Sequence, residues 1–416
     1  MNLKAFFTFF LVLTFYCSAY ADINEIYFIA PTGATGKFSR LFYEYVKEFN
    51  HKHMKNRIIF IPLQEWDIVI SQAKEMAASG KKFIFISEVS QTYEIENLNI
   101  ATNYDDFYGN KKNELKKINA DIFIEYSKNS FGKDGKMYGL PIFRSMPVVF
   151  YNLDYLKKAG YNQKNLPKNW FEFKIMLEKM KQALNMTPFV LAGDWYDFLF
   201  EALVIQAGGR IIDSKNKKIK FYSPEAIVAL TYWKELIDAK LMKRVENWKG
   251  AINGFIAGKF PVIFYSSGGM GSAQETEGLN WLADMLPKNK KYGCPYGGGN
   301  LYLGKTINMN DRDFVIEFIK TLYQPHIAAE ISDLSGYLPV TKSSFKLQKI
   351  KDKYNKIQAY KNVFRQVPYA QLKMMGIQNL KIRESLKKAI DRTLDEGMQP
   401  EKSLKKAQQE LDKFEY

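Results

Sequence analysis

The chain has 416 residues and a formal net charge of +16 at pH 7, which becomes +15 without residues 1–21 because that segment carries one lysine and no acid. The length suggests two or three ordinary domains or one large two-lobed body. The lysines are scattered over expected helix faces and loops, without interleaved aromatic residues, which argues against a nucleic-acid interface. We interpret the charge as solvated surface that helps to steer an anionic ligand.

The first 21 residues have the parts of a secretory signal peptide. Lys4 is followed by the apolar run "AFFTFFLVLTFY" and by "CSAYA", which predicts cleavage before Asp22 and export to the periplasm. A membrane anchor is disfavoured because only about 13 apolar residues precede the small residues, against roughly 20 for a spanning helix. A lipoprotein anchor at Cys17 is disfavoured by the bulky Tyr16.

Cleavage would leave a chain of 395 residues (416 minus 21) with Cys294 as its one cysteine. An intramolecular disulfide is then impossible even in an oxidising compartment, so stability must come from the core. No later segment of the sequence is long and apolar enough to span a bilayer.

Strands and helices alternate in the first part of the expected mature chain. The apolar runs predict strands at 24–30, 56–64 and 81–90, and the amphipathic segments predict helices at 36–53 and 65–80. This alternation is typical of a parallel sheet covered by helices on both faces. The sequence therefore predicts an α/β lobe.

A second α/β block starts near residue 136. A strand at 146–152 leads into a helix at 153–160, and "LPKNWFEFKIMLEKMKQAL" at 166–184 predicts the next helix. The segments that follow are a strand and helix within 187–209, a helix at 223–242, and a helix with an apolar strand within 250–270.

The C-terminal part is predicted to be almost entirely helical. A helix-like segment at 311–334 runs into Gly336, which can end a helix in the left-handed conformation. Pro339 pushes Leu338 out of the helical region, so Tyr337 is expected on a short extended connector. The clearest later helical segments are 379–397 and 400–416.

Three strand-like segments marked by Gly or Pro are expected to cross between two lobes. They are "GLPIFRS" at 139–145, "YGGGNLYL" at 296–303 and "SGYLPVT" at 335–341. The corresponding lobe boundaries are 22–143 with 299–336 for the first lobe, and 144–298 with 337–416 for the second. Tyr337 would then face a cleft shared by both lobes.

The sequence offers no obvious catalytic set. The three histidines are His51, His53 and His326, and neither a nucleophile elbow, a phosphate loop nor a dinucleotide fingerprint is present. His51 and His53 lack nearby partners for a metal, so we interpret them as surface residues. We expect recognition rather than catalysis, with no metal and no cofactor.

Several stretches carry a family resemblance: "LPIFRSMPVVFYNLDYLKKAG", "LPKNWFEF", "GFIAGKFPVIFYSSG", "YGGGNLYL" and "SGYLPVTKSSF". In their order and spacing they resemble the extracytoplasmic solute-binding proteins of ABC importers, in the sugar-binding group that includes maltose-binding proteins, and most closely the sn-glycerol-3-phosphate-binding members. The resemblance covers essentially the whole expected mature chain. It implies a two-lobed α/β fold of the type II periplasmic binding protein kind, with three crossings and a ligand cleft.

The resemblance also implies ligand residues. Glu88 in "FISEVS" matches a glutamate that accepts hydrogen bonds from glycerol hydroxyls, although a carboxylate at a helix N-terminus would look the same. Ser145, Ser266 and the main-chain N–H of Gly298 match phosphate donors. Capping serines and a hinge glycine are the structural alternatives.

Three further residues match the family's ligand set. Tyr337 corresponds to a tyrosine that donates to the phosphate, and Arg383 to an arginine whose planar fork binds phosphate oxygens. Trp195 corresponds to the apolar wall of the ligand site. Packed core aromatics and a solvated arginine are the alternatives.

Three positions depart from the family pattern. Trp66 stands where the family has a phosphate-binding tyrosine, and an indole N–H donates but does not accept. Arg144 replaces a small polar residue and would either strengthen phosphate binding or pair with a surface acid. Phe198 replaces the second tryptophan of the wall.

From this resemblance we expect a monomeric periplasmic protein that binds sn-glycerol-3-phosphate, or a glycerophosphodiester such as glycerophosphocholine, by closure of the cleft and delivers it to an ABC permease. The alternatives are a neutral oligosaccharide-binding protein of the same fold, an exported interaction protein that has lost transport, and an exported hydrolase. A phosphodiester is compatible with Trp66, whose ring could face a quaternary ammonium.

Overall fold

The computed structural model describes residues 23–32, 37–213 and 218–413. The predicted signal peptide, residues 1–21, lies outside these ranges. Within them, every helix is too short or too polar to cross a membrane.

The first lobe is built on a mixed sheet with the described strand order β2-β1-β3-β12-β4, and β5 pairs with β12. Its strands are β1 (Asn24–Ala30), β2 (Asn56–Pro62), β3 (Phe83–Glu88), β4 (Ala101–Thr102), β5 (Gly139–Pro141) and β12 (Gly299–Gly304). The predicted parallel pairing is confirmed for β1 with β2 and β3. It is wrong for the sheet as a whole, because β12 enters from far along the chain and runs antiparallel to β3.

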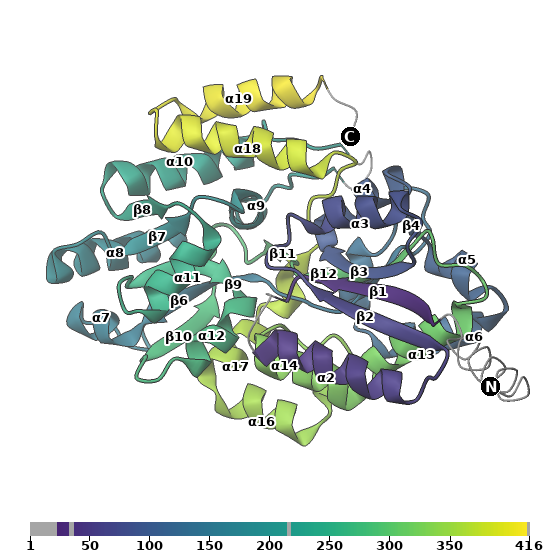
Figure 1. Cartoon of the computed structure of the whole chain (residues 1–416). Helices are drawn as coiled ribbons and strands as arrows, with labels where there is room; N and C mark the ends of the chain where they lie inside the picture. The colour runs from purple at the N-terminus through teal and green to yellow at the C-terminus, as the bar shows by residue number, and fades with distance from the viewer. Residues whose placement is uncertain (1–22, 33–36, 214–217, 414–416) are drawn as a thin grey trace, which may run out of the picture.

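Helices cover both faces of this sheet (Figure 1). They are α2 (Lys37–His51), α3 (Val69–Ala78), α4 (Thr92–Asn97), α5 (Tyr104–Tyr108), α6 (Lys112–Asp121), α13 (Arg312–Leu322) and α14 (Pro325–Ser335). In α2, Phe42, Val46 and Phe49 are buried at positions that repeat every three to four residues, so one stripe of the helix faces the sheet. The rings of Phe28 on β1 and Phe318 on α13 pack edge to face, with centroids 5.3 Å apart.

The single helix-like segment predicted at 311–334 is two helices. Gln324 is extended and Pro325 begins α14 at its first turn. Proline has no N–H and its ring clashes with the preceding turn, so it fits the start of a helix and not its interior. The periodic apolar pattern continues across this break, which is why it suggests one helix.

The second lobe is built on a five-stranded sheet of order β10-β6-β9-β7-β8. Its strands are β6 (Pro147–Asn152), β7 (Phe189–Ala192), β8 (Met242–Val245), β9 (Val262–Ser266) and β10 (Trp281–Met285). β6 lies antiparallel between β9 and β10, whereas β7 is parallel to β8 and β9. β6 and β7 are buried throughout, as expected for strands covered on both faces.

The helices of the second lobe are α7 (Leu153–Lys158), α8 (Trp170–Leu184), α9 (Tyr196–Gln206), α10 (Pro224–Asp238), α11 (Trp248–Ile256) and α12 (Met270–Glu275). Side chains cap the first turns of α7, α8, α10 and α11. Asn169 accepts a hydrogen bond from the Glu172 N–H at 2.9 Å and so starts α8. Ser223 caps α10, with Pro224 at its first position.

The C-terminal helices pack mainly on the second lobe. They are α15 (Lys342–Phe345), α16 (Gln348–Lys356), α17 (Gln358–Phe364), α18 (Asn379–Leu394) and α19 (Pro400–Leu411). In Figure 1, α18 and α19 (yellow) lie beside α10, and all three elements contact one another. The chain crosses from α17 to α18 through β13 (Ala370–Gln371), which pairs with β11 (Cys294–Pro295), so the predicted helical character of this region is interrupted there.

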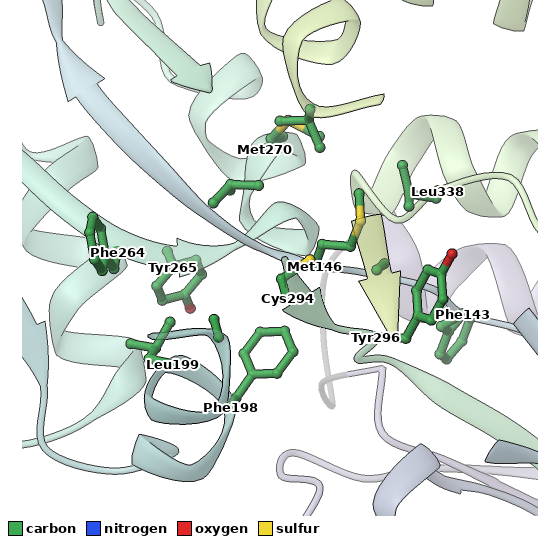
Figure 2. Packing of buried hydrophobic residues seen from close by; sticks show 14 of the residues in the cluster. Phe143, Met146, Phe198, Leu199, Phe264, Tyr265, Met270, Cys294, Tyr296 and Leu338 are labelled. Carbon is green, nitrogen blue, oxygen red and sulfur yellow. The ribbon is translucent and has the colours of Figure 1, made fainter. Parts of the chain in front are cut away.

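The three predicted crossings lie side by side. The Ser145 and Gly297 backbones exchange hydrogen bonds of 3.1 and 2.8 Å, and the Leu338 N–H donates to the Arg144 carbonyl at 2.7 Å. Gly336 ends α14 at φ +77°, which confirms the left-handed stop. Figure 2 shows Met146 at the centre of a buried cluster with Phe198 and Tyr265 on one side and Phe143 and Leu338 on the other, so apolar packing continues through the crossings from one lobe to the other.

Candidate functional site

A cavity of about 750 Å³ opens between the cleft-facing ends of the two sheets. The predicted ligand residues that line it are Trp66, Glu88, Ser145, Trp195, Phe198, Ser266, Gly298 and Tyr337. Lining residues that sequence reasoning missed include Gln64, Glu65, Asp67, Asp194, Asn247, Trp248, Lys249 and Tyr265. Arg144 and Arg383 do not line the cavity.

Aromatic rings form the wall on the second lobe. Trp195 immediately precedes α9 at φ +56°, an unusual conformation for a residue with a Cβ. Its ring centre lies 5.8 Å from that of Trp248, which in turn stacks on Tyr265 at 4.0 Å and 22°. The wall presents flat apolar surfaces to the cavity, the kind of surface on which sugar rings or carbon chains pack.

The missed member of this wall, Trp248, carried a local signal in the sequence. It follows Asn247, whose side chain accepts from the Gly250 N–H at 2.8 Å and starts α11 directly after β8. A strand followed by a capped helix presents the helix start at the cleft edge of an α/β sheet. An aromatic residue at that point was therefore a candidate wall residue.

Small donors gather where the crossings meet the cavity. Ser266 accepts from the Gly268 N–H at 3.1 Å, so its capping role and a ligand role coexist. Gly298 adopts φ +97°, and a Cβ there would collide with the Phe143 carbonyl oxygen, so a side chain is excluded. Tyr337 stacks on Phe143 with ring centres 5.1 Å apart and planes 14° apart, which fixes its phenol at the cavity.

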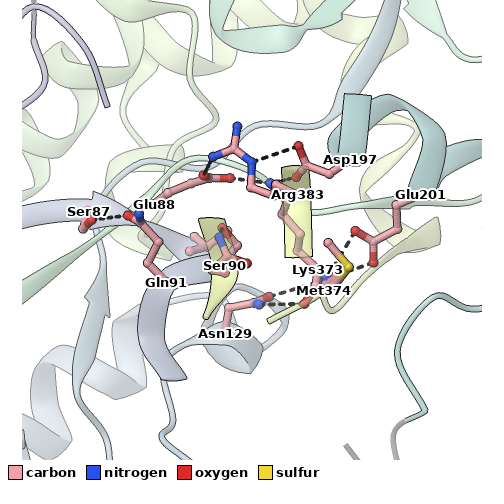
Figure 3. A network of polar contacts seen from close by, with 12 residues as sticks. Ser87, Glu88, Ser90, Gln91, Asn129, Asp197, Glu201, Lys373, Met374 and Arg383 are labelled. Carbon is pink, nitrogen blue, oxygen red and sulfur yellow. Dashed lines mark hydrogen bonds and ion pairs between the residues drawn. The ribbon is translucent and has the colours of Figure 1, made fainter. Parts of the chain in front are cut away.

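A buried ion-pair cluster lies beneath the cavity at Glu88 (Figure 3). Lys373 pairs with Glu88 and, at 3.0 Å, with Asp197, and its side chain is fully buried. The Arg383 guanidinium lies between Glu88 and Asp197, with Nη1 3.5 Å from Glu88 Oε2 and Nε 3.2 Å from Asp197 Oδ1. Nη1 also lies 3.3 Å from Asp67 Oδ1, so this cluster joins residues of both lobes.

The charges in this cluster shift one another's pKa values. Burial opposes ionisation of Asp197, but the charges of Lys373 and Arg383 outweigh it and lower its pKa to about 2. Burial lowers the pKa of Lys373, while Asp197 and Glu88 raise it by more, so the lysine stays charged. Asp197 and Lys373 are therefore both charged at neutral pH.

Glu201, one turn along α9 from Asp197, behaves differently. Its carboxylate oxygens accept from the Met374 N–H at 2.9 and 3.2 Å, and burial raises its pKa to about 8 despite the nearby Lys373 charge. At neutral pH this group is mostly protonated. It contributes a hydrogen bond to the cluster and little charge.

Sequence reasoning missed Lys373 and Asp197. Lys373 stands in "AQLKMMG", where a lysine is followed by two methionines that are buried. A lysine in an apolar run is a signal of a buried, paired charge, because an unpaired one would be too costly. Asp197 was hidden in "DWYDFLF", which the apolar pattern assigns to core.

Arg144 is fully buried at the crossings and does not line the cavity. Its Nε and Nη2 donate to the Tyr126 carbonyl, Nη1 donates to the Phe143 and Gly299 carbonyls, and Nη2 donates also to Asn300 Oδ1. The expectation of a surface acid as partner is wrong, because all five N–H groups are bound to neutral oxygens. Burial lowers the pKa of Arg144 to about 10.

The cavity lining is acidic although the chain as a whole is basic. In the part of the chain that the structure describes, its charged lining consists of the carboxylates Glu65, Asp67, Glu88 and Asp194 and the cation Lys249. Burial raises the pKa of Asp194 to about 6. Among the described residues, no group of three or more His, Cys, Asp or Glu side chains has the arrangement of a metal site.

The sequence and the fold both match known proteins. A family described as "Bacterial extracellular solute-binding protein" matches residues 44–359. The sn-glycerol-3-phosphate-binding periplasmic protein UgpB of Brucella abortus (strain 2308) is 27% identical over 266 residues, which is 61% of this chain and 58% of that protein. The corresponding protein of Escherichia coli (strain K12) is 24% identical over 239 residues, 55% of this chain and 54% of the relative. The aligned part thus spans less than two thirds of these relatives.

Solved structures show the same fold over nearly the whole chain. UgpB from Mycobacterium tuberculosis in complex with glycerophosphocholine superposes with a TM-score of 0.81 at 18% identity, covering 94% of this chain and 98% of that one. Maltose-bound T. maritima MalE3 gives 0.78 at 18% identity, covering 93% and 99%. The predicted two-lobed type II fold is confirmed.

Proposed function

The chain belongs to the bacterial extracellular solute-binding protein family, whose members are non-enzymatic binding components of importers, and we propose that it binds a phosphate-bearing glycerol ligand in its interlobe cavity. The ligand is sn-glycerol-3-phosphate or a glycerophosphodiester. The protein works in the periplasm after removal of residues 1–21, and it delivers the ligand to the membrane subunits of an ABC permease.

One observation carries the proposal: small neutral donors line one cavity, and Arg383 lies in the ion-pair cluster beneath it. Ser145, Ser266, the Gly298 N–H and the Tyr337 hydroxyl supply donors without bulk at the crossings. Arg383 has carboxylate partners at Nε and Nη1, and no described residue accepts a hydrogen bond from its Nη2. Phosphate oxygens suit such donors, since charged hydrogen bonds to a guanidinium are stronger than neutral ones.

We assign the glycerol end of the ligand to Glu88. Its two oxygens already face Lys373 and Arg383, which keeps the carboxylate oriented at the cavity. A carboxylate oxygen has lone pairs for several donors, so glycerol hydroxyls can add to these contacts. The aromatic wall of Trp195 and Trp248 would cover the carbon backbone.

A ligand held in this way contacts both lobes. Glu88 belongs to the first sheet, Ser266 to the second, and Ser145 and Tyr337 to the crossings. Such a ligand has a higher affinity for the closed arrangement of the lobes than for an open one, and therefore shifts the population toward closure.

A neutral oligosaccharide is the second candidate. The stacked Trp248 and Tyr265, with Trp66 and Trp195 beside the same cavity, offer several aromatic faces, and maltose is the ligand of one structurally similar protein. The cavity of about 750 Å³ is also larger than a single glycerol phosphate needs. A glycerophosphodiester would use more of it, as in the glycerophosphocholine complex of another similar protein.

Isothermal titration calorimetry of residues 22–416 with three ligands tests the proposal. We expect saturable one-to-one heat with sn-glycerol-3-phosphate or glycerophosphocholine and weaker or no heat with maltose. Binding of maltose alone would overturn the phosphate assignment in favour of the oligosaccharide candidate. Silence with all three would favour an interaction protein that has kept the fold without the ligand specificity.

A further inference from the structure

The ion-pair cluster beneath the cavity contains more carboxylates than cations, although the proposed ligand is an anion. Arg383 and Lys373 provide two cations, and they pair with three carboxylates: Asp67, Glu88 and Asp197. With Glu201 mostly protonated, the cluster has an excess of negative charge. A phosphate group approaching Arg383 would therefore be repelled unless one carboxylate moves away.

The three carboxylates differ in how firmly they are held. The side chains of Glu88 and Asp197 are 3% and 2% exposed, and each also pairs with the buried Lys373. Moving either of them would leave a buried cation short of a partner, which is strongly unfavourable. They are fixed parts of the cluster.

Asp67 is the carboxylate that can leave. Its side chain is 59% exposed, it lies between β2 and α3, and Arg383 is its one ion-pair partner among the described residues. Water replaces such an exposed contact at little cost. Asp67 also lines the cavity, so its carboxylate and a ligand anion would draw on the same space beside Arg383.

We propose that Asp67 is a specificity-determining residue that competes with the anionic group of the ligand for Nη1 of Arg383. The inference rests on the proposed function, because it concerns the same site. The competition lowers the affinity for every anion, and it lowers the affinity for a dianion more than for a singly charged diester. The affinity for a neutral sugar is not lowered by this competition.

The test compares Asp67→Asn with wild type by calorimetry, with sn-glycerol-3-phosphate as the anionic probe and maltose as the neutral one. Asparagine keeps the size of the side chain and removes its charge. We expect the affinity for sn-glycerol-3-phosphate to rise about tenfold and the ratio of that affinity to the maltose affinity to rise with it. Thermal unfolding of each variant checks that the fold is intact.

Two further variants separate competition for Arg383 from a general change of charge. Glu65→Gln removes a carboxylate that lines the same cavity but forms no ion pair with Arg383, and we expect at most a twofold gain. In the Arg383→Gln background, Asp67→Asn should give no gain: the double variant should bind sn-glycerol-3-phosphate no more tightly than Arg383→Gln alone. An equal gain in Glu65→Gln, or a gain that survives in the double variant, would overturn the competition.

The outcomes for the two proposals are distinct. Unchanged or weaker binding of sn-glycerol-3-phosphate by Asp67→Asn overturns the role of Asp67 even if wild type binds this ligand well. If wild type is silent and Asp67→Asn binds, the role of Asp67 is supported, while sn-glycerol-3-phosphate is no longer the ligand of the natural protein. If both are silent with it, the inference is wrong.

Discussion

The buried Arg144 and the partly buried Arg383 have opposite environments. Arg144 lies at the crossings with its five N–H groups on neutral oxygens, and no carboxylate of the described residues pairs with it. Arg383 lies beneath the cavity among three carboxylates, and its Nη2 has no partner among the described residues. The first region is a completed hydrogen-bond network, and the second has donor capacity left for a ligand.

The local sequence around an arginine therefore does not disclose its role. "FRSMP" places Arg144 next to the cavity residue Ser145, yet the side chain turns away into the packed crossings. Arg383 is on a helix with many lysines and has the sequence context of a solvated charge. In both cases some partners come from segments far along the chain, such as Gly299 for Arg144 and Asp67 for Arg383, and a local pattern cannot place them.

The largest effect is expected when Arg144 is replaced by lysine. Lysine keeps the charge but has three N–H donors in place of five and lacks the planar fork, so at least two buried hydrogen bonds are lost. We predict that Arg144→Lys lowers the free energy of unfolding by about 3 kcal/mol in urea denaturation. The exposed Arg365 provides the control, and Arg365→Lys should change it by less than about 0.5 kcal/mol. Similar values for the two variants would refute the structural role of Arg144.

The same change at Arg383 should act on binding. Lysine cannot hold Asp197 and also offer a second N–H edge to a phosphate oxygen. We predict that Arg383→Lys weakens binding of sn-glycerol-3-phosphate about thirtyfold, or ~2 kcal/mol, in calorimetry. If Arg144→Lys, measured on folded protein, weakened binding by the same factor, the assignment of Arg383 to binding and Arg144 to stability would be contradicted.

The raised pKa of Glu201 makes the stability of the folded protein depend on pH. Its pKa is about 8 in the folded protein and 4.5 unfolded, so between these values the folded state binds more protons, and stability falls as pH rises. The slope is at most about 1.4 kcal/mol per pH unit and vanishes above the folded pKa. Asp197, with a lowered pKa, loses its contribution only as pH falls below 3.8.

Glu201→Gln should remove this slope. Glutamine keeps an oxygen for the Met374 N–H but does not titrate, so the variant should match wild type near pH 5 and exceed it near pH 8.5. Urea denaturation at four pH values between 5 and 8.5 provides the measurement. A wild-type slope that persists in the variant would show that another group is responsible.

The smallest effect concerns the aromatic wall. Trp248→Leu removes a flat surface from the cavity and leaves the ion pairs untouched. We predict a fivefold loss, or ~1 kcal/mol, in affinity for sn-glycerol-3-phosphate. A loss of 100-fold or more, together with retained binding of this ligand by Arg383→Lys, would show that the aromatic wall supplies more of the binding free energy than the charged cluster.

Many strands, helices and crossings of the fold could be predicted from the sequence because their signals are local. Gly336 and Pro339 set the third crossing, and the apolar run at 24–30 coincides with β1. The antiparallel pairing of β12 and the ion-pair partners of Lys373 could not be predicted with the same rules, since both depend on contacts made by the tertiary fold. Likewise, the resemblance supplied Glu88 and Arg383 as separate ligand residues, and the geometry joins them in one cluster with Asp197.

Hydrogen–deuterium exchange of residues 22–416, with and without sn-glycerol-3-phosphate, tests most directly whether the ligand binds between the lobes. We predict slower exchange at amides from both walls of the cavity and from a crossing, including Trp66, Gly268 and Gly298, with no change at 124–129 beside Arg144. Slowing confined to one lobe, or centred on 124–129, would contradict this prediction.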